Sequence, residues 1–125
     1  MNENEISYYI RKAIYEVYNE TGPGLLESTY EVAWKHELES DGLNVKSQVV
    51  LPIRYKGVVL SASYRIDLLV EDKVIIELKS VEELNKVHHK QVITYLKLSD
   101  LKLGILVNFN TNDLNRSIVR KVNNL

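Results

Sequence analysis

Residues 63–79 read SYRIDLLVEDKVIIELK, and this stretch predicts a β-hairpin at the centre of the fold. Both halves are rich in Val, Ile and Leu, as strands are, and only Glu-Asp-Lys at residues 71–73 separates them. With these three residues as the turn, the numbers of paired residues sum to 144, so that Asp67 lies directly opposite Glu77. The hairpin therefore brings two carboxylates together inside an apolar sheet.

Facing carboxylates repel each other, so a cation is expected between Asp67 and Glu77. One candidate is Mg²⁺ or Mn²⁺, because hard cations prefer oxygen ligands, and the backbone carbonyl of Leu78 would add another oxygen. The other is a salt-bridge network with Arg65 and Lys79, which the strand alternation places on the same face. The spacing alone leaves both interpretations open.

The composition predicts one globular domain spanning residues 1–125, with 45% hydrophobic and 26% charged residues. The absence of cysteine excludes disulfides and thiolate zinc sites. No apolar run approaches membrane-spanning length and the N-terminus is polar, so a cytoplasmic location is expected, with no membrane partner. The net charge of −1 argues against a bulk electrostatic nucleic-acid binder, although residues 1–78 carry −5 and residues 79–125 carry +4.

Hydrophobic periodicity predicts the element order α-α-β-β-β-β-α-β-β. Apolar residues at helical spacing predict a helix at 5–20 and a second one from Leu26 or Glu27 to residue 40, with Leu26 on its inner stripe and Glu31 on its outer face. Residues 74–76 are apolar on both faces, which is typical of a central strand. The remaining predicted elements are strands at 45–51, 58–60, 63–70 and 74–78, a helix at 83–98, and strands at 103–109 and 117–122.

Three further side chains have a chemical and a structural interpretation. Lys79 lies beside Glu77 and would stabilise a pentavalent phosphate or orient the attacking water, or would only pair with the carboxylates. Gln91 and Tyr95 are four residues apart on one helix face and would hold a phosphate or a metal-bound water, or would form a half-buried helix edge. The sequence alone does not decide between these roles.

Glu27 and Tyr30 begin the second predicted helix after the turn at residues 22–24. An acid in this position interacts favourably with the helix dipole, and a tyrosine one turn later packs in the core. Adjacent His88 and His89 point roughly 100° apart on a helix, which argues against a metal shared by them.

Four ordered motifs nevertheless resemble one family. Gly24 to Tyr30 reads GLLESTY, an intact Gly-x-x-Glu-x-x-Tyr, which resembles the signature of the GxxExxY proteins of the PD-(D/E)xK nuclease superfamily. Asp67 followed by Glu77-Leu78-Lys79 resembles the Asp and Glu-x-Lys of that superfamily, with Ile66 in place of its proline. Gln91-x-x-x-Tyr95 resembles the helix motif of the RecB-like and lambda-exonuclease-like branches.

The resemblance implies an α/β, restriction-endonuclease-like fold. Its core is α-β-β-β-α-β, with a mixed central sheet flanked by helices, and the helix at 5–20 is an N-terminal addition. It also implies Mg²⁺- or Mn²⁺-dependent hydrolysis of phosphodiester bonds, with DNA as the expected substrate. In that family Asp67, Glu77 and the carbonyl of Leu78 would bind the metal, and Glu27 would approach it. Lys79, Gln91 and Tyr95 would complete the catalytic set.

Two other hypotheses stand beside the nuclease. A non-catalytic module of the same fold would bind nucleic acid or a protein partner, which suits the small size and the near-neutral charge. A homodimer would join the basic second halves of two chains into one groove, because a duplex-cleaving enzyme must reach both strands.

Overall fold

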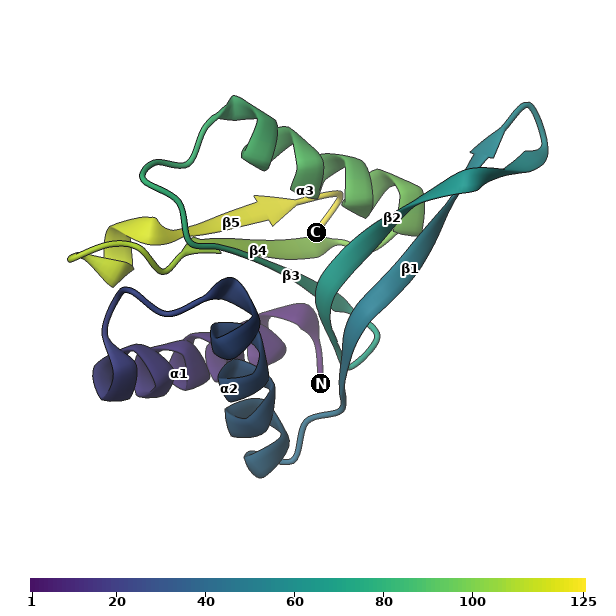
Figure 1. The fold of residues 1–125 in the computed structure, drawn as a ribbon. Coiled ribbons are helices and arrows are strands. Elements are labelled where there is room, and N and C mark those ends of the chain that lie inside the picture. Colours follow the sequence, from purple (N-terminus) through teal and green to yellow (C-terminus); the bar gives the residue numbers. More distant parts are fainter.

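The computed structural model describes all 125 residues as two N-terminal helices, a five-stranded sheet and one helix between strands (Figure 1). The expected order is confirmed, except that one strand fewer precedes the third helix. The elements are α1 (Glu3–Thr21), α2 (Glu27–Ser40), β1 (Val45–Tyr55), β2 (Val58–Val70), β3 (Val74–Lys79), α3 (Lys86–Ser99), β4 (Leu103–Asn108), a 3₁₀ turn (Leu114–Ser117) and β5 (Ile118–Val122).

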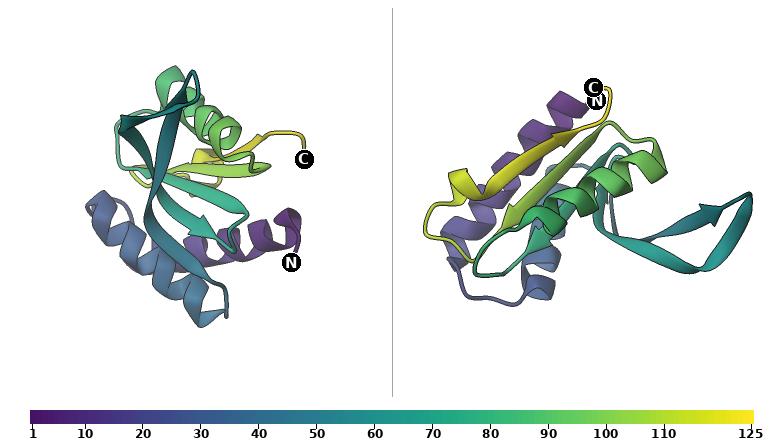
Figure 2. Two further views of the ribbon diagram at one scale, coloured as in Figure 1. Left: turned by 90° about the vertical axis from the view of Figure 1, so that its right-hand side faces the viewer. Right: turned by 90° about the horizontal axis from the view of Figure 1, so that it is seen from above.

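The sheet has the order β1-β2-β3-β4-β5, with β3 and β4 parallel and all other neighbours antiparallel. Helix α3 makes the crossover that a parallel pair requires. Helices α1 and α2 cover one face and α3 covers the other (Figures 1 and 2). Every residue of β4 is buried, as is every residue of β3 except Lys79, so the apolar run at 74–76 is the central strand that its composition predicts.

Two hydrophobic cores lie on the two faces of the sheet. The larger contains twenty buried residues under α1 and α2, among them Tyr30, whose ring stacks on Phe109 with centroids 4.0 Å apart. The indole nitrogen of Trp34 donates to the carbonyl of Ile10 at 3.1 Å, which joins α2 to α1. The smaller core contains six buried residues under α3.

The hairpin of β2 and β3 has the predicted register. Leu68 pairs with Ile76, Leu69 with Ile75 and Val70 with Val74, and each pair sums to 144. The three-residue turn places Glu71 and Asp72 at positive φ, 54° and 53°, which closes the loop between the two strands.

The first hairpin differs from the prediction, because the expected strands at 58–60 and 63–70 form the single strand β2. The strand expected at 45–51 is also longer, because β1 continues to Tyr55 through a register shift between Pro52 and Arg54. The outer parts of β1 and β2 leave the sheet as a long ribbon (Figures 1 and 2). We call this ribbon, residues 49–66, the arm.

One helix boundary and one position expected in the core also differ. Helix α3 begins at Lys86 rather than near residue 83, because the side chain of Asn85 accepts the N–H groups of Val87 and His88 and caps the helix. Leu26 is 74% exposed, since it precedes the first turn of α2 and does not reach the core stripe. No helix is long and apolar enough to cross a membrane.

Candidate active site

Asp67 occupies the point where β2 separates from β3. The ladder between the two strands ends at the Leu68–Ile76 pair, and the Asp67 carboxylate then accepts the N–H of Leu78 at 3.0 Å. The side-chain alternation also breaks here, because Ile66 packs in the core under α3 while Leu68 packs in the core under α1 and α2. The sequence predicted a direct Asp67–Glu77 pair within the ladder, whereas the ladder ends one pair earlier and Asp67 bonds to Leu78 instead.

Glu77 is an acid inside the sheet, with 2% of its surface exposed. The pKa of Glu77 is raised to about 10, mainly by burial and in addition by a hydrogen bond to the Asp67 carboxyl and by the charge of Asp67. Its Oε1 is buried without a hydrogen-bond partner. An ionised carboxylate in such a place requires a cation, because uncompensated burial of charge is costly.

The salt-bridge interpretation fails for these acids. Neither Arg65 nor Lys79 lies within ion-pair distance of Asp67 or Glu77, and the four ion pairs of the protein are all elsewhere. The Lys79 charge lowers the pKa of Glu77, but burial and Asp67 outweigh it. Oxygen donors and an unpartnered buried carboxylate oxygen fit a hard divalent cation.

An acidic cavity of about 460 Å³ opens on the α2 side of this pair. Asp67, Leu78 and Lys79 line it from the sheet, and Glu27 lines it from α2. The carboxylate of Glu27 accepts the N–H of Ser80 at 3.2 Å, which holds it at the end of β3. No three Asp, Glu, His or Cys side chains are arranged to hold a metal ion, so Glu27 lines the cavity without completing a ligand set.

Glu31 and Gln48 belong to the same cavity, although neither was among the site residues predicted from the sequence. The prediction that Glu31 lies on the outer face is wrong: it follows Glu27 by one helical turn and therefore shares its direction. Gln48 Nε2 donates to Glu31 Oε1 at 2.6 Å. Burial is the main cause that raises the pKa of Glu31, and the charge of Asp67 adds to it.

Gln48 lies beside the break in the sheet. Its neighbours Ser47 and Val49 pair with Leu68 and Ile66, so Gln48 stands opposite Asp67, and its φ is 53°. A non-glycine residue in this left-handed region costs energy, and such positions cluster at functional sites. The i,i+4 spacing from Glu27 would have pointed to Glu31, but no sequence signal indicates the left-handed backbone at Gln48.

A second cavity of about 400 Å³ lies on the α3 side, and Lys79 lines both cavities. Gln91 and Tyr95 line the second one, and Gln91 Nε2 donates to Tyr95 Oη at 2.8 Å. Burial raises the pKa of Tyr95, and the nearby Glu77 charge contributes. The predicted pair is therefore a hydrogen-bonded unit on α3 that borders this cavity together with Lys79.

The Gly-x-x-Glu-x-x-Tyr segment has a structural explanation. Gly24 has φ 107°, a conformation that favours glycine. The Tyr30 hydroxyl donates to the carbonyl of Gly22 at 2.6 Å and accepts the N–H of Leu25 at 3.1 Å. The core tyrosine thus fixes the loop that delivers Glu27 to the cavity, and its expected packing role is confirmed by its complete burial.

A comparison with known protein families matches residues 4–121 to the PD-(D/E)XK nuclease superfamily. A comparison with curated proteins found no match. Among solved structures, the crystal structure of SSO0001 is similar, with a TM-score of 0.56 and 24% sequence identity over 95% of this chain and 60% of that one. This chain therefore spans less than two thirds of SSO0001, and the similarity shows the fold alone. Because the family match extends over nearly the whole sequence, the chain belongs to the PD-(D/E)XK nuclease superfamily.

Proposed function

We propose that this protein is a Mg²⁺- or Mn²⁺-dependent nuclease that hydrolyses phosphodiester bonds, with DNA as the expected substrate. The observation that carries the proposal is the buried Glu77 carboxylate, with one unpartnered oxygen, beside Asp67, which lines the acidic cavity. Membership of the superfamily and the intact Gly-x-x-Glu-x-x-Tyr string support it.

Asp67 and Glu77 would hold the metal, together with the backbone carbonyl of Leu78. The bound ion would supply positive charge to the scissile phosphate and to its attacking water. Glu27 borders the same cavity and is fixed by Ser80, so it would orient groups that approach the metal from α2.

Lys79 would stabilise the negative charge that develops on the phosphate. Its position between the acidic cavity and the α3-side cavity places an ammonium group beside both. Charge stabilisation by a fixed cation in a partly desolvated site is a large contribution to catalysis. Gln91 and Tyr95 would act as a hydrogen-bonded pair on the same phosphate from α3.

The test is cleavage of single- and double-stranded DNA and RNA in Mn²⁺ or Mg²⁺. Asp67→Asn and Lys79→Ala are expected to lower the rate at least about 100-fold, in line with the loss of one charge-stabilising group. Asp72→Asn and Lys73→Ala are matched controls, because both residues lie in the exposed turn of the same hairpin. Cleavage that persists in both Asp67→Asn and Lys79→Ala would refute the proposal.

One observation favours a non-catalytic module instead: no third acid joins Asp67 and Glu77 in a ligand set. Such a module would bind nucleic acid or a protein partner without metal. Titration calorimetry distinguishes the two, since a module would show no Mn²⁺ binding even with DNA present. A homodimer stays a separate prediction, which light scattering at working concentration tests.

A further inference from the structure

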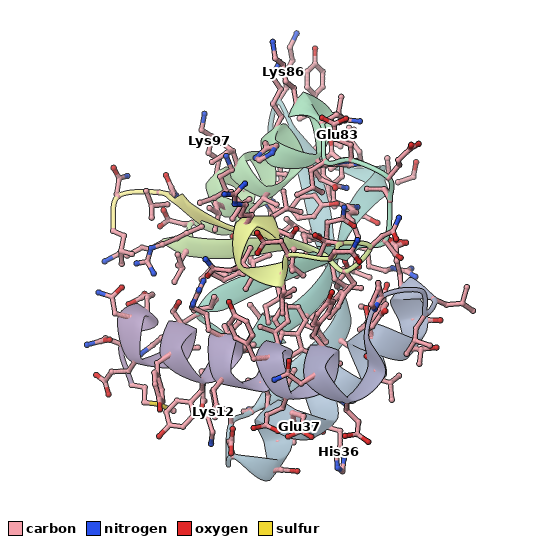
Figure 3. The ribbon with its side chains drawn as sticks, turned by 90° about the vertical axis from the view of Figure 1, so that its left-hand side faces the viewer. Lys12, His36, Glu37, Glu83, Lys86 and Lys97 are labelled. Atoms are coloured by element: carbon pink, nitrogen blue, oxygen red, sulfur yellow. The ribbon has the colours of Figure 1, made fainter.

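Charged residues are distributed unevenly between the two sides of the sheet. Helices α1 and α2 together carry eight glutamates against three lysines and arginines. The arm and α3 carry three basic residues each and no acid. Figure 3 shows Lys86 and Lys97 at one end of the molecule, where Glu83 of the loop before α3 also lies, and Glu37 at the other end together with Lys12. A polyanion is therefore attracted to the side of α3 and the arm.

The α3-side cavity is the concave part of that basic layer, and we call it the α3 trough. Tyr64 at the base of the arm and Tyr95 in α3 face each other there, with ring centroids 5.3 Å apart and an interplanar angle of 51°. Tyr64 is 40% exposed. Lys79, His88 and Lys90 supply cationic or polar groups to the same cavity. The acids of the preceding loop do not line it.

The face of the arm that contains Tyr64 is apolar and open. Leu51 pairs with Tyr64, and Tyr55 pairs with Val58 beyond the register shift. Tyr55 and Val58 are each 59% exposed, and Leu60 is 40% exposed. This apolar stripe leads from the tip of the arm to the trough.

The occupant that fits these features is a single strand of nucleic acid. Unstacked bases present π-faces that stack on tyrosine, while their phosphates pair with lysine. A duplex hides its bases inside the stack and would leave the apolar stripe unused. The arm of a second copy is disfavoured as the occupant of the trough, because two arms of charge +3 would repel each other.

We propose that the α3 trough binds single-stranded nucleic acid, with Tyr64 as the stacking platform and Lys90 as a phosphate contact. This inference rests on the proposed function, since Lys79 lines both the trough and the acidic cavity and would lead the strand to Asp67 and Glu77. The substrate would then be a single strand or the unpaired end of a duplex.

The experiment measures binding of a fluorescent dT20 oligonucleotide in EDTA by anisotropy, so that cleavage plays no part. Tyr64→Leu is expected to weaken binding about 5- to 100-fold, and Tyr64→Phe to retain it, since stacking needs only the ring. Lys90→Ala is expected to weaken binding. It should also make the slope of log K against log[salt] shallower by roughly 0.7, the contribution of one phosphate contact on a single strand. Tyr8→Leu, on the exposed side of α1, and Lys35→Ala, in α2, are controls expected to bind as the wild type.

Several results would overturn the inference: no wild-type binding to dT20, wild-type affinity in both Tyr64→Leu and Lys90→Ala, an equal loss in the controls, or equal binding of a duplex dependent on Tyr64. Thermal melts check that each variant is folded. If Tyr64-dependent binding is present but Mn²⁺ produces no cleavage, the proposed nuclease function fails while the trough assignment stands. If cleavage depends on metal but neither cleavage nor binding changes in Tyr64→Leu, the trough assignment fails while the proposed nuclease function stands.

Discussion

The carboxylate of Asp67 accepts the backbone N–H of Leu78, with 3.0 Å between Oδ2 and N, where the ladder between β2 and β3 has ended. A side chain thus replaces a backbone carbonyl as the partner of this strand. The bond fixes Asp67 beside Glu77 and lets the outer part of β2 leave the sheet as the arm. The site and the arm are therefore two consequences of the same strand separation.

Glu77→Gln is expected to stabilise the metal-free protein. The folded-state pKa of Glu77, about 10, lies above its ordinary value of 4.5. Folding therefore favours the protonated form, and stability is lost progressively as the pH rises from 4.5 towards 10. A neutral amide avoids that loss, so the gain should be small at pH 5 and exceed about 1 kcal/mol at pH 8.5, a rise of roughly 4 °C or more in Tm.

Thermal melts in EDTA at the two pH values measure this effect. Glu39→Gln is the control, because Glu39 is exposed and pairs only with Lys35, at 4.0 Å. A gain in Tm that is equal at both pH values, or equal in the control, would contradict the assignment of Glu77 as a buried protonated acid.

Metal binding is expected to release about one proton at pH 7. A ligating carboxylate must be ionised, and Glu77 is protonated in the metal-free protein. The Mn²⁺ affinity should therefore rise with pH, approaching tenfold per pH unit below the pKa. Calorimetry in two buffers of different ionisation enthalpy reports the proton. Heats independent of the buffer, or unchanged binding in Glu77→Gln, would show that Glu77 is not a ligand.

Tyr30→Phe is expected to lower stability by about 1–2 kcal/mol, because two hydrogen bonds of the loop before α2 depend on the hydroxyl. Tyr15→Phe is the matched control: its hydroxyl donates to Asn115 at 3.1 Å on the exposed surface, and its loss should cost less. Urea denaturation measures both. Equal costs would mean that the Tyr30 hydroxyl does not hold the loop.

Gly104→Ala is expected to destabilise the contact between α3 and β4. An added Cβ would lie 2.6 Å from Cγ1 of Val92, closer than atoms pack, and such overpacking costs roughly 1–3 kcal/mol. In the double variant Gly104→Ala/Val92→Ala the costs should be less than additive, since the smaller side chain makes room. Fully additive costs in urea denaturation would place the strain elsewhere.

The amino-acid pattern was sufficient for most of the fold. Apolar runs with three intervening residues gave the register of β2 and β3, because a hairpin with a short turn leaves little freedom in strand pairing. The run at 74–76 is apolar on both faces and so identified the central strand, because a strand covered on both sides is buried at every position. The pattern at 58–63 did not predict that β2 is one continuous strand. Residues in the exposed arm lack the alternation of buried and exposed positions by which a strand is recognised.

The candidate site was predicted in part. Asp67, Glu77, Lys79, Gln91 and Tyr95 follow from strand pairing, helix spacing and the family resemblance. Glu31 and Gln48 were missed, because their meeting depends on how α2 lies over β1, which no local period encodes.

The sequence by itself determined the register of β2 and β3 as far as the Leu68–Ile76 pair, because the three-residue turn fixes the pairing, and it thereby brought Asp67 close to Glu77. Only the tertiary structure decided that Glu77 is buried with an unpartnered oxygen, that Asp67 caps the end of the ladder, and that the arm and α3 enclose a trough. The physical reason is that burial, desolvation and cavity shape depend on elements far apart in the chain, which pack together only when the whole domain folds.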